Sequence, residues 1–183
     1  MMEKMQIRLS GSGGQGIITA GIILAEAALL DGNNALQSQS YGPEARGGSS
    51  KAEVIISSED IEFPKVTTPN ILLSLTQPSY DLYRGSVASD ATVIVDSSIN
   101  ALSDANQKLY SLPILATAND ELKRPVVANI IALGVIAEIT GCISATALEQ
   151  AVLSRVPKGT EELNKKALAA GVAMAKRVKE SSN

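Results

Sequence analysis

The stretch from Leu9 to Gly32, LSGSGGQGIITAGIILAEAALLDG, constrains the fold more than any other part of the sequence. A buried strand is expected to end there, glycines turn the chain, and a long apolar helix is expected over residues 17–30. Gly11, Gly13 and Gly16 match the pattern G-x-G-x-x-G between a strand and a helix, which is the context this pattern requires. Such a turn presents bare N–H groups at a helix N-terminus, where the helix dipole favours an anion. The stretch therefore predicts an α/β fold in which the backbone closely approaches a ligand or another piece of protein.

Strands and helices alternate through the first two thirds of the chain, and the last third is predicted to be helical. Strands are expected at residues 6–10, 33–42, 51–58, 69–78, 91–98 and within 110–119, a short helix or turn at 80–87, and helices at 125–141, 144–156 and 160–180. We predict a single domain over residues 1–183. Its expected fold is three-layer α/β/α, with a largely parallel or mixed central sheet of about five or six strands and a helical C-terminal segment.

Composition excludes several kinds of chemistry. The chain has no histidine and one cysteine, Cys142, so it lacks Ser–His and Cys–His catalytic pairs, an internal disulfide and a cysteine cage for zinc or an iron–sulfur cluster. Cys142 is expected to be a small core residue. A formal net charge of −3 gives no basic surface for nucleic acid or an anionic membrane. No signal-peptide pattern and no membrane-spanning apolar run are seen, so a cytoplasmic location is expected.

The glycine pattern lacks the rest of a dinucleotide fingerprint. In that fingerprint a carboxylate near the end of the second strand binds the ribose hydroxyls. Here the second expected strand ends in LQSQSY, and the nearest acid, Glu44, lies beyond a Gly-Pro turn. Tight binding of NAD or FAD is therefore not expected. Two hypotheses stay open: a loop that binds another phosphate, and a glycine turn that serves close packing within the chain or against a partner.

A second glycine-rich loop follows the second expected strand. It reads YGPEARGG and contains Tyr41, Gly42, Pro43, Glu44, Arg46, Gly47 and Gly48. In a parallel sheet this loop and the first glycine turn would share the carboxyl edge, where ligands of open α/β sheets bind. We predict a substrate or interface loop. The alternative is a mobile hairpin connection with an ion pair between Glu44 and Arg46 that shapes it.

Three segments together carry a family resemblance. GSGGQGIITAGIILAEAA, SYGPEARGGSSKAEVIIS and RPVVANIIALG occur in this order and spacing, and the likeness extends from Ile7 to about Gly171. The chain resembles the gamma subunit of 2-oxoacid:ferredoxin oxidoreductases, the group that acts on pyruvate, 2-oxoglutarate or ketoisovalerate. Its length is similar to that of the separate small subunit, and nothing in PEARGG distinguishes the substrate acid.

The resemblance implies a function for the whole complex. Enzymes of this family oxidatively decarboxylate a 2-oxoacid, join the acyl group to coenzyme A and pass two electrons to ferredoxin. They use thiamine diphosphate, Mg²⁺ and iron–sulfur clusters, which this resemblance assigns to the alpha and beta subunits and to a ferredoxin-like delta subunit. The gamma chain is expected to bind no metal, to carry no catalytic residue and to be inactive alone. Its implied part is structure, together with a coenzyme A phosphate loop made of Gly11, Ser12, Gly13, Gly14, Gln15 and Gly16.

Two expected helices are apolar on nearly all sides. They cover residues 17–30 and 126–140, and such helices are buried either by their own domain or by a partner. The alternatives to a coenzyme A loop are therefore a purely structural assembly subunit and a stand-alone nucleotide-binding protein. If apolar surface stays uncovered, the isolated chain is expected to form a homodimer, since two-fold pairing is the commonest closed symmetry.

Overall fold

The computed structural model describes residues 4–40, 49–102 and 104–181 of the chain. In this part, one six-stranded sheet has the order β2-β3-β1-β4-β5-β6. The strands are β1 (Met5–Ser12), β2 (Asn34–Ser40), β3 (Ser49–Ser57), β4 (Ile71–Ser74), β5 (Thr92–Asp96) and β6 (Lys108–Leu112). A strand overlaps every predicted range, but residues 77–78 and 114–119, which were included in predicted strand ranges, are helical.

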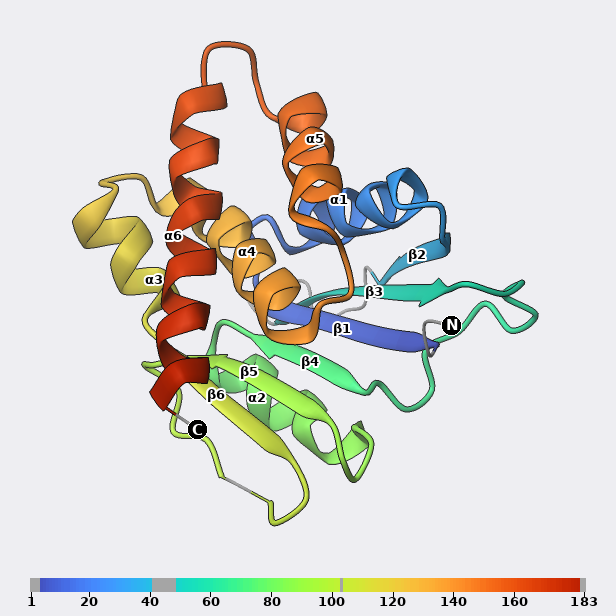
Figure 1. Ribbon diagram of the computed structural model, residues 1–183. Helices are drawn as coiled ribbons and strands as arrows, with labels where there is room; N and C mark the ends of the chain where they lie inside the picture. Colours follow the sequence, from blue (N-terminus) through green and yellow to red (C-terminus); the bar gives the residue numbers. More distant parts are fainter. Residues whose placement is uncertain (1–3, 41–48, 103, 182–183) are drawn as a thin grey trace.

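The helices divide unequally between the two faces of the sheet. They are α1 (Ile17–Leu30), α2 (Gln77–Tyr83), α3 (Ile114–Ala116), α4 (Ala128–Thr140), α5 (Ala145–Arg155) and α6 (Glu161–Ser181), with single turns η2 (Arg84–Ser86), η3 (Thr117–Glu121) and η4 (Pro125–Val127). Figure 1 shows α1, α4, α5 and α6 on one face, whereas α2 lies on the other. The predicted three-layer α/β/α fold with a helical C-terminal segment is confirmed, with one thick and one thin helical layer.

The sheet is mixed, because one strand runs against the others. β1, β4, β5 and β6 pair in parallel, whereas β3 pairs antiparallel with both β1 and β2. Two antiparallel steps leave β2 pointing the same way as β1. The carboxyl ends of β1 and β2 therefore share one edge of the sheet, although the sheet is not fully parallel.

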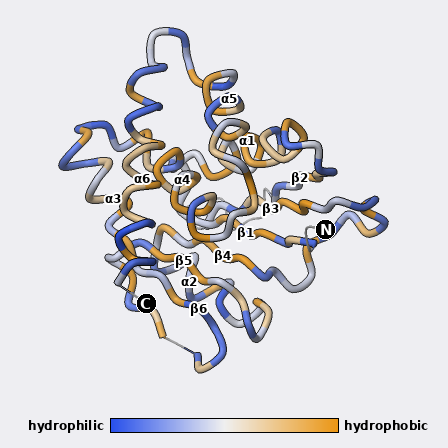
Figure 2. The backbone as a smooth tube through the Cα atoms, in the orientation of Figure 1, coloured by the Kyte–Doolittle hydropathy of each residue, from blue (hydrophilic) through white to orange (hydrophobic). Residues whose placement is uncertain are grey.

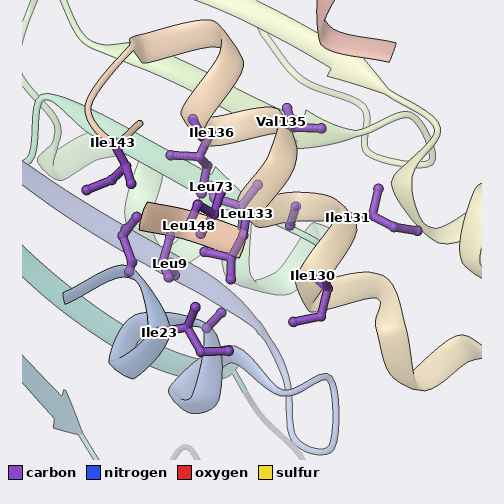
Figure 3. Close-up of a cluster of buried hydrophobic side chains, with 14 of the residues drawn as sticks. Leu9, Ile23, Leu73, Ile130, Ile131, Leu133, Val135, Ile136, Ile143 and Leu148 are labelled. Atoms are coloured by element: carbon purple, nitrogen blue, oxygen red, sulfur yellow. The ribbon is translucent and has the colours of Figure 1, made fainter. Parts of the chain in front are cut away.

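The main core lies between the sheet and the thick helical layer. Strand side chains that point to this face, such as Leu9 and Leu73, meet Ile23 of α1 and Ile130 and Leu133 of α4 (Figure 3). Figure 2 shows the apolar residues concentrated along these inner strands and helices. Each fully buried Leu or Ile contributes about 1.5–3 kcal/mol relative to an exposed one, so this layer supplies most of the driving force for folding.

The thin layer has its own small core and one buried charge. Leu72, Val93 and Tyr80 pack between the sheet and α2. Arg8 of β1 is 6% exposed, and its guanidinium pairs with Glu53 of β3 at 2.7 Å and donates to Ser86 Oγ at 2.6 Å. The arginine thus joins two strands to the η2 turn, and its charge is both paired and hydrogen-bonded, as burial requires.

The two apolar helices are buried by this chain itself. All residues of α4 from Ala128 to Ala137 are buried, and α1 is covered by β2, β3, α4 and α5. α4 is therefore covered from within the chain, whereas α1 leaves Leu29 and Leu30 exposed at its C-terminal end. The other large apolar side chains that stay exposed in the described part of the chain are Phe63, Leu82, Leu102 and Val126.

Two glycines let α4 and α6 cross at close range. A Cβ added at Gly134 would lie 2.5 Å from the carbonyl oxygen of Leu168 on α6. A Cβ added at Gly171 of α6 would collide with the carbonyl oxygen of Ile131 on α4. Both obstructing atoms are backbone atoms, which move only if a whole helix shifts. Neither glycine is in a left-handed conformation, so each is required for space and not for its φ angle.

Gly171→Ala is predicted to lower the free energy of unfolding by about 1–3 kcal/mol, the usual cost of forcing extra volume into a packed core. Alanine is the better helix former, so helix propensity alone predicts the opposite sign. Denaturant titration measures the change. Gly85→Ala is the control, because a Cβ at Gly85 meets nothing within 4 Å. A Gly171→Ala variant as stable as the parent would contradict the tight crossing.

Cys142 is predicted to react with a thiol reagent only when the chain unfolds. It is 2% exposed, and burial raises the pKa of its thiol, so the reactive thiolate is suppressed in the folded state. Labelling with an aromatic disulfide should be slow in buffer and complete in denaturant, and a cysteine introduced at the exposed Ala169 serves as the control. Equally fast labelling of both cysteines in buffer would show that Cys142 is accessible.

Candidate functional site

The glycine turn between β1 and α1 lies at the carboxyl edge of the sheet, where the chain changes direction. β1 ends at Ser12, and α1 begins at Ile17 after Gly16 as its N-cap. Gly14 and Gly16 have φ values of 86° and 71°, a left-handed conformation that glycine adopts without a steric penalty. The predicted glycine turn is therefore present, and these two glycines meet a requirement of its backbone.

Part of the turn is fixed from inside by Gln15. Its Oε1 accepts a hydrogen bond from the Ser12 N–H at 2.8 Å, and its own N–H donates to the Ser12 carbonyl at 3.3 Å. A Cβ on Gly11 would collide with Oε1 of Gln15, so a larger residue there would push the Gln15 amide away from Ser12. Gly11, Ser12 and Gln15 thus shape the loop, and the Ser12 N–H already has a partner within it.

The remaining backbone donors of the turn are open. Within the described part of the chain, no hydrogen bond engages the N–H groups of Gly13, Gly14 and Gly16 or those of the first turn of α1, at residues 17–19. α1 has no side-chain cap and no acidic residue in its first turn. A Cβ at Gly13 or Gly14 would meet nothing within 4 Å. The loop therefore combines unused donors, the positive end of a helix dipole and open space in front of them.

The turn is also next to the topological switch point of the sheet. β1 leads into α1 on one face, whereas its parallel neighbour β4 leads into α2 on the opposite face. In open α/β sheets a crevice forms where successive connections diverge in this way, and ligands bind there. The ends of the two strands are joined by a hydrogen bond of 2.9 Å between the hydroxyls of Ser10 and Ser74. The position of the loop is thus one that favours ligand binding.

A second helix N-terminus meets the loop through Asn129. This residue lies in the first turn of α4 and is 6% exposed. Its Nδ2 donates to the carbonyl oxygen of Gly16 at 3.2 Å, and its Oδ1 accepts from the N–H of Ile130 at 2.9 Å. In the sequence, Asn129 is a lone polar residue of the apolar segment RPVVANIIALG, one of the three that carry the family resemblance. No local pattern predicts its contact with Gly16.

A pocket of about 250 Å³ opens beside the loop. Its walls come from α1, from η4 and the start of α4, and from the α5–α6 connection, and its lining includes Gly14, Gly16, Thr19, Val126, Asn129 and Arg155. Val126 at its rim is 70% exposed. Arg155 makes an ion pair with Glu26, whose carboxylate raises the pKa of the guanidinium. The pocket is largely apolar, with two glycines of the loop and one paired cation in its lining.

The second glycine-rich loop falls outside the described residues, from Tyr41 and Gly42 through Pro43, Glu44 and Arg46 to Gly47 and Gly48. The strand residues on either side of it are described. Ser49 pairs with Ser12, Ser50 pairs with Gly11, and Ser40 lies opposite Lys51. The chain therefore leaves β2 and enters β3 at the same edge as the glycine turn, as the sequence predicted from the strand ends.

The side chains of the described residues do not fit a metal or cluster site. The composition of the chain offers no histidine and a single, buried cysteine. Among the described residues, no group of three or more Cys, Asp or Glu side chains is arranged to hold a metal ion. The aspartate that ends β5, Asp96, is used for structure: it accepts hydrogen bonds from Ser98 and from the N–H of Leu115. No helix among the described residues is long and apolar enough to span a membrane.

Comparison with known proteins identifies the family. Residues 6–174 match the family model for pyruvate ferredoxin/flavodoxin oxidoreductase. The 2-oxoglutarate synthase subunit KorC of Methanocaldococcus jannaschii is 47% identical over 179 residues, which is 96% of each chain. The gamma subunit of a keto/oxoacid ferredoxin oxidoreductase from Geobacter sulfurreducens is 46% identical with a TM-score of 0.85, and the match covers 94% of this chain and 99% of that one.

A more distant structure shares the fold. It is the 2-oxoglutarate:ferredoxin oxidoreductase of Magnetococcus marinus, solved with 2-oxoglutarate, coenzyme A and succinyl-CoA bound. The match has a TM-score of 0.85 at 22% identity and covers 97% of this chain but 32% of that one. The present fold thus also occurs as one part of a longer oxidoreductase chain. Fold, family model and near full-length relatives agree that the chain belongs to the pyruvate ferredoxin/flavodoxin oxidoreductase family and is the gamma subunit of a 2-oxoacid:ferredoxin oxidoreductase.

Proposed function

We propose that this subunit binds the phosphates of coenzyme A through the glycine turn at residues 11–16, within the assembled oxidoreductase. The observation that carries the proposal is the set of unpartnered N–H groups at Gly13, Gly14, Gly16 and the first turn of α1. Phosphate oxygens are acceptors that suit such donors, and the helix dipole adds to their attraction. Gly11, Ser12 and Gln15 hold the turn in the shape that presents these donors.

The loop and the pocket beside it suit a ligand with an anionic and an apolar part. Gly14 and Gly16 of the loop are among the residues that line the 250 Å³ pocket, whose walls are mostly apolar. Coenzyme A carries phosphates, and its adenine ring and the methyl and methylene groups of its pantetheine arm are apolar, so one molecule can use both features. A simple inorganic anion would use the donors alone.

The division of labour in the complex follows from the side chains this subunit lacks. Thiamine diphosphate with Mg²⁺ and iron–sulfur clusters need ligands that the described residues do not bring together, so we assign them to alpha and beta subunits and to a ferredoxin-like delta subunit. The complex releases CO₂ from the 2-oxoacid, forms the acyl thioester and passes two electrons to ferredoxin. The 47% identity to a 2-oxoglutarate synthase subunit supports 2-oxoglutarate as the acid.

An assembly role is the second candidate function. The described residues on either side of the segment 41–48, Ser40 and Ser49, lie at the same edge of the sheet as the glycine turn. We propose that this segment meets a partner subunit there, because Tyr and Arg are favoured at interface centres and glycine permits close approach. Impaired assembly after Arg46→Glu, with normal folding of the isolated chain, is the outcome that supports this role.

The isolated chain is predicted to turn over no 2-oxoacid. It has no histidine, and its described residues place no thiamine or cluster ligands together. The measurement is reduction of a low-potential viologen dye in the presence of thiamine diphosphate, Mg²⁺, coenzyme A and each of several 2-oxoacids. The reconstituted complex serves as the positive control. Any dye reduction by the purified gamma chain above the no-protein rate would contradict the prediction.

Gly13→Val is predicted to raise the KM for coenzyme A by about tenfold or more while leaving kcat near the parent value, the pattern that follows loss of ligand binding alone. The added side chain would occupy the open space in front of the loop. Gly13 is not left-handed, and its Cβ would touch nothing within 4 Å, so no folding defect is expected. Steady-state kinetics of the complex gives both constants.

The matched control is Gly85→Val, another glycine with open space around its Cβ, on the η2 turn beside α2. It should leave the KM for coenzyme A unchanged. If Gly13→Val leaves the KM unchanged but prevents assembly, judged by light scattering, the glycine turn is an assembly surface. An unchanged KM in a fully assembled Gly13→Val complex would refute coenzyme A binding at this loop.

A further inference from the structure

Asn129 makes the one side-chain hydrogen bond, among the described residues, that joins the glycine turn to α4. The bond runs from its Nδ2 to the carbonyl oxygen of Gly16 and spans 113 residues of sequence. The same carbonyl accepts the N–H of Ala20 at 2.9 Å, which is the first hydrogen bond of α1. Asn129 therefore acts on the residue from which α1 starts and at which the loop turns.

We infer that Asn129 is the positioning residue of the glycine turn: it fixes the direction in which the open N–H groups face, and thereby the affinity for the coenzyme A phosphates. This inference rests on the proposed function. Asn129 itself touches the loop through a carbonyl and uses none of the open donors. It acts on the ligand only through Gly16.

Contact geometry makes Gly16 and Asn129 a matched pair. A Cβ on Gly16 would lie 2.5 Å from Nδ2 and 2.9 Å from Cγ of Asn129. Gly16 also has a φ of 71°, which a residue with a side chain rarely adopts. Space and backbone angle thus both require glycine, and the amide of Asn129 fills the space that glycine leaves. Without the amide, the left-handed turn at Gly16 would lose both this packing contact and the hydrogen bond to its carbonyl oxygen.

The anchor of this contact is rigid. Asn129 is buried in the first turn of α4, and its Oδ1 is held by the Ile130 N–H. α4 packs tightly against α6 at Gly134 and Gly171, where the backbones of the two helices lie in close contact. Packed helices of this kind do not deform gradually. The carbonyl of Gly16 is therefore held at a fixed place relative to the thick helical layer.

The chemistry of the amide suits this position. A neutral donor satisfies the Gly16 carbonyl without consuming a loop N–H and without adding negative charge beside an anion. A carboxylate there would repel both the carbonyl oxygen and a phosphate. A methyl group would remove the hydrogen bond and add no charge. Asn129→Ala and Asn129→Asp therefore separate loss of positioning from added charge.

Asn70 offers a closely matched control. Its Nδ2 donates to the carbonyl oxygen of Lys4 at 3.2 Å, and its Oδ1 accepts from the N–H of Gln6 at 2.9 Å. These are the same two kinds of bond at the same lengths as those of Asn129. Asn70 precedes β4 and so lies at the amino edge of the sheet, opposite to the glycine turn. Asn70→Asp and Asn70→Ala make the same chemical changes away from the loop.

The experiment measures kcat, the KM for coenzyme A and the assembled fraction of the reconstituted complex for all four variants, at low and raised ionic strength. Asn129→Ala should raise this KM about fivefold, the effect expected for one neutral hydrogen bond, with kcat nearly unchanged. Asn129→Asp should raise this KM further than Asn129→Ala does. Raised ionic strength should reduce only the difference in KM between these two variants, because salt screens the added charge. Both Asn70 variants should leave the KM unchanged.

The outcomes separate this inference from the proposed function. If Gly13→Val raises the KM but Asn129→Ala does not, coenzyme A binds at the loop and the positioning role is overturned. If neither variant changes the KM, the proposed function itself fails. If the Asn129 variants lose assembly or thermal stability without a change in KM of the assembled fraction, Asn129 is only structural and the inference is also overturned.

Discussion

The burial of α4 between the sheet and α6 is the constraint on which the rest of the structure depends. A helix covered on all sides must be apolar throughout, as α4 is from Ile130 to Ala137 apart from its backbone. It can approach α6 so closely only because Gly134 and Gly171 stand at the crossing. Once α4 is fixed, its N-terminus is fixed too, and the Asn129 amide meets the Gly16 carbonyl at one defined place. The packing of the helical layer thus determines the geometry at the sheet edge.

At that edge the structure satisfies some backbone groups and leaves others open. Most buried N–H and C=O groups in proteins are paired. In the glycine turn, Gln15 pairs both the N–H and the carbonyl of Ser12, and Asn129 pairs the carbonyl of Gly16. The N–H groups of Gly13, Gly14 and Gly16 remain without a partner among the described residues. The open N–H groups favour a ligand rich in negative oxygen acceptors.

Local sequence patterns predicted most helices and strands, because each of these elements has its own pattern of apolar residues and end residues. Residues 17–30 form a helix as expected, and the predicted helix at 125–141 does end at Gly141, whose φ of 65° is a common helix terminus. Strand direction carried no such signal, so the antiparallel pairing of β3 was not predicted. The apolar character of α1 and α4 did not reveal whether this chain or a partner covers them. The structure answers that question.

The candidate site could be predicted only in part. The glycine spacing predicted a turn before α1, and the strand ends predicted that two loops share one edge if the sheet is parallel. The roles within the turn were not predictable, because nothing in the motif shows that Gln15 folds back onto Ser12. Asn129 could not be predicted as a partner of Gly16, since a contact across 113 residues leaves no local pattern. The family resemblance supplied coenzyme A as the ligand, and the open donors supply the physical reason for it.

Amide hydrogen exchange tests the central claim most directly, because the claim concerns particular N–H groups. In the assembled complex without coenzyme A, the amides of Gly13, Gly14 and Gly16 should exchange rapidly, since they have no hydrogen-bond partner among the described residues. Saturating coenzyme A should slow their exchange by about tenfold or more, whereas pantetheine, which has no phosphate, should not. Protection elsewhere in the complex with unchanged exchange at residues 13–16 would contradict the account.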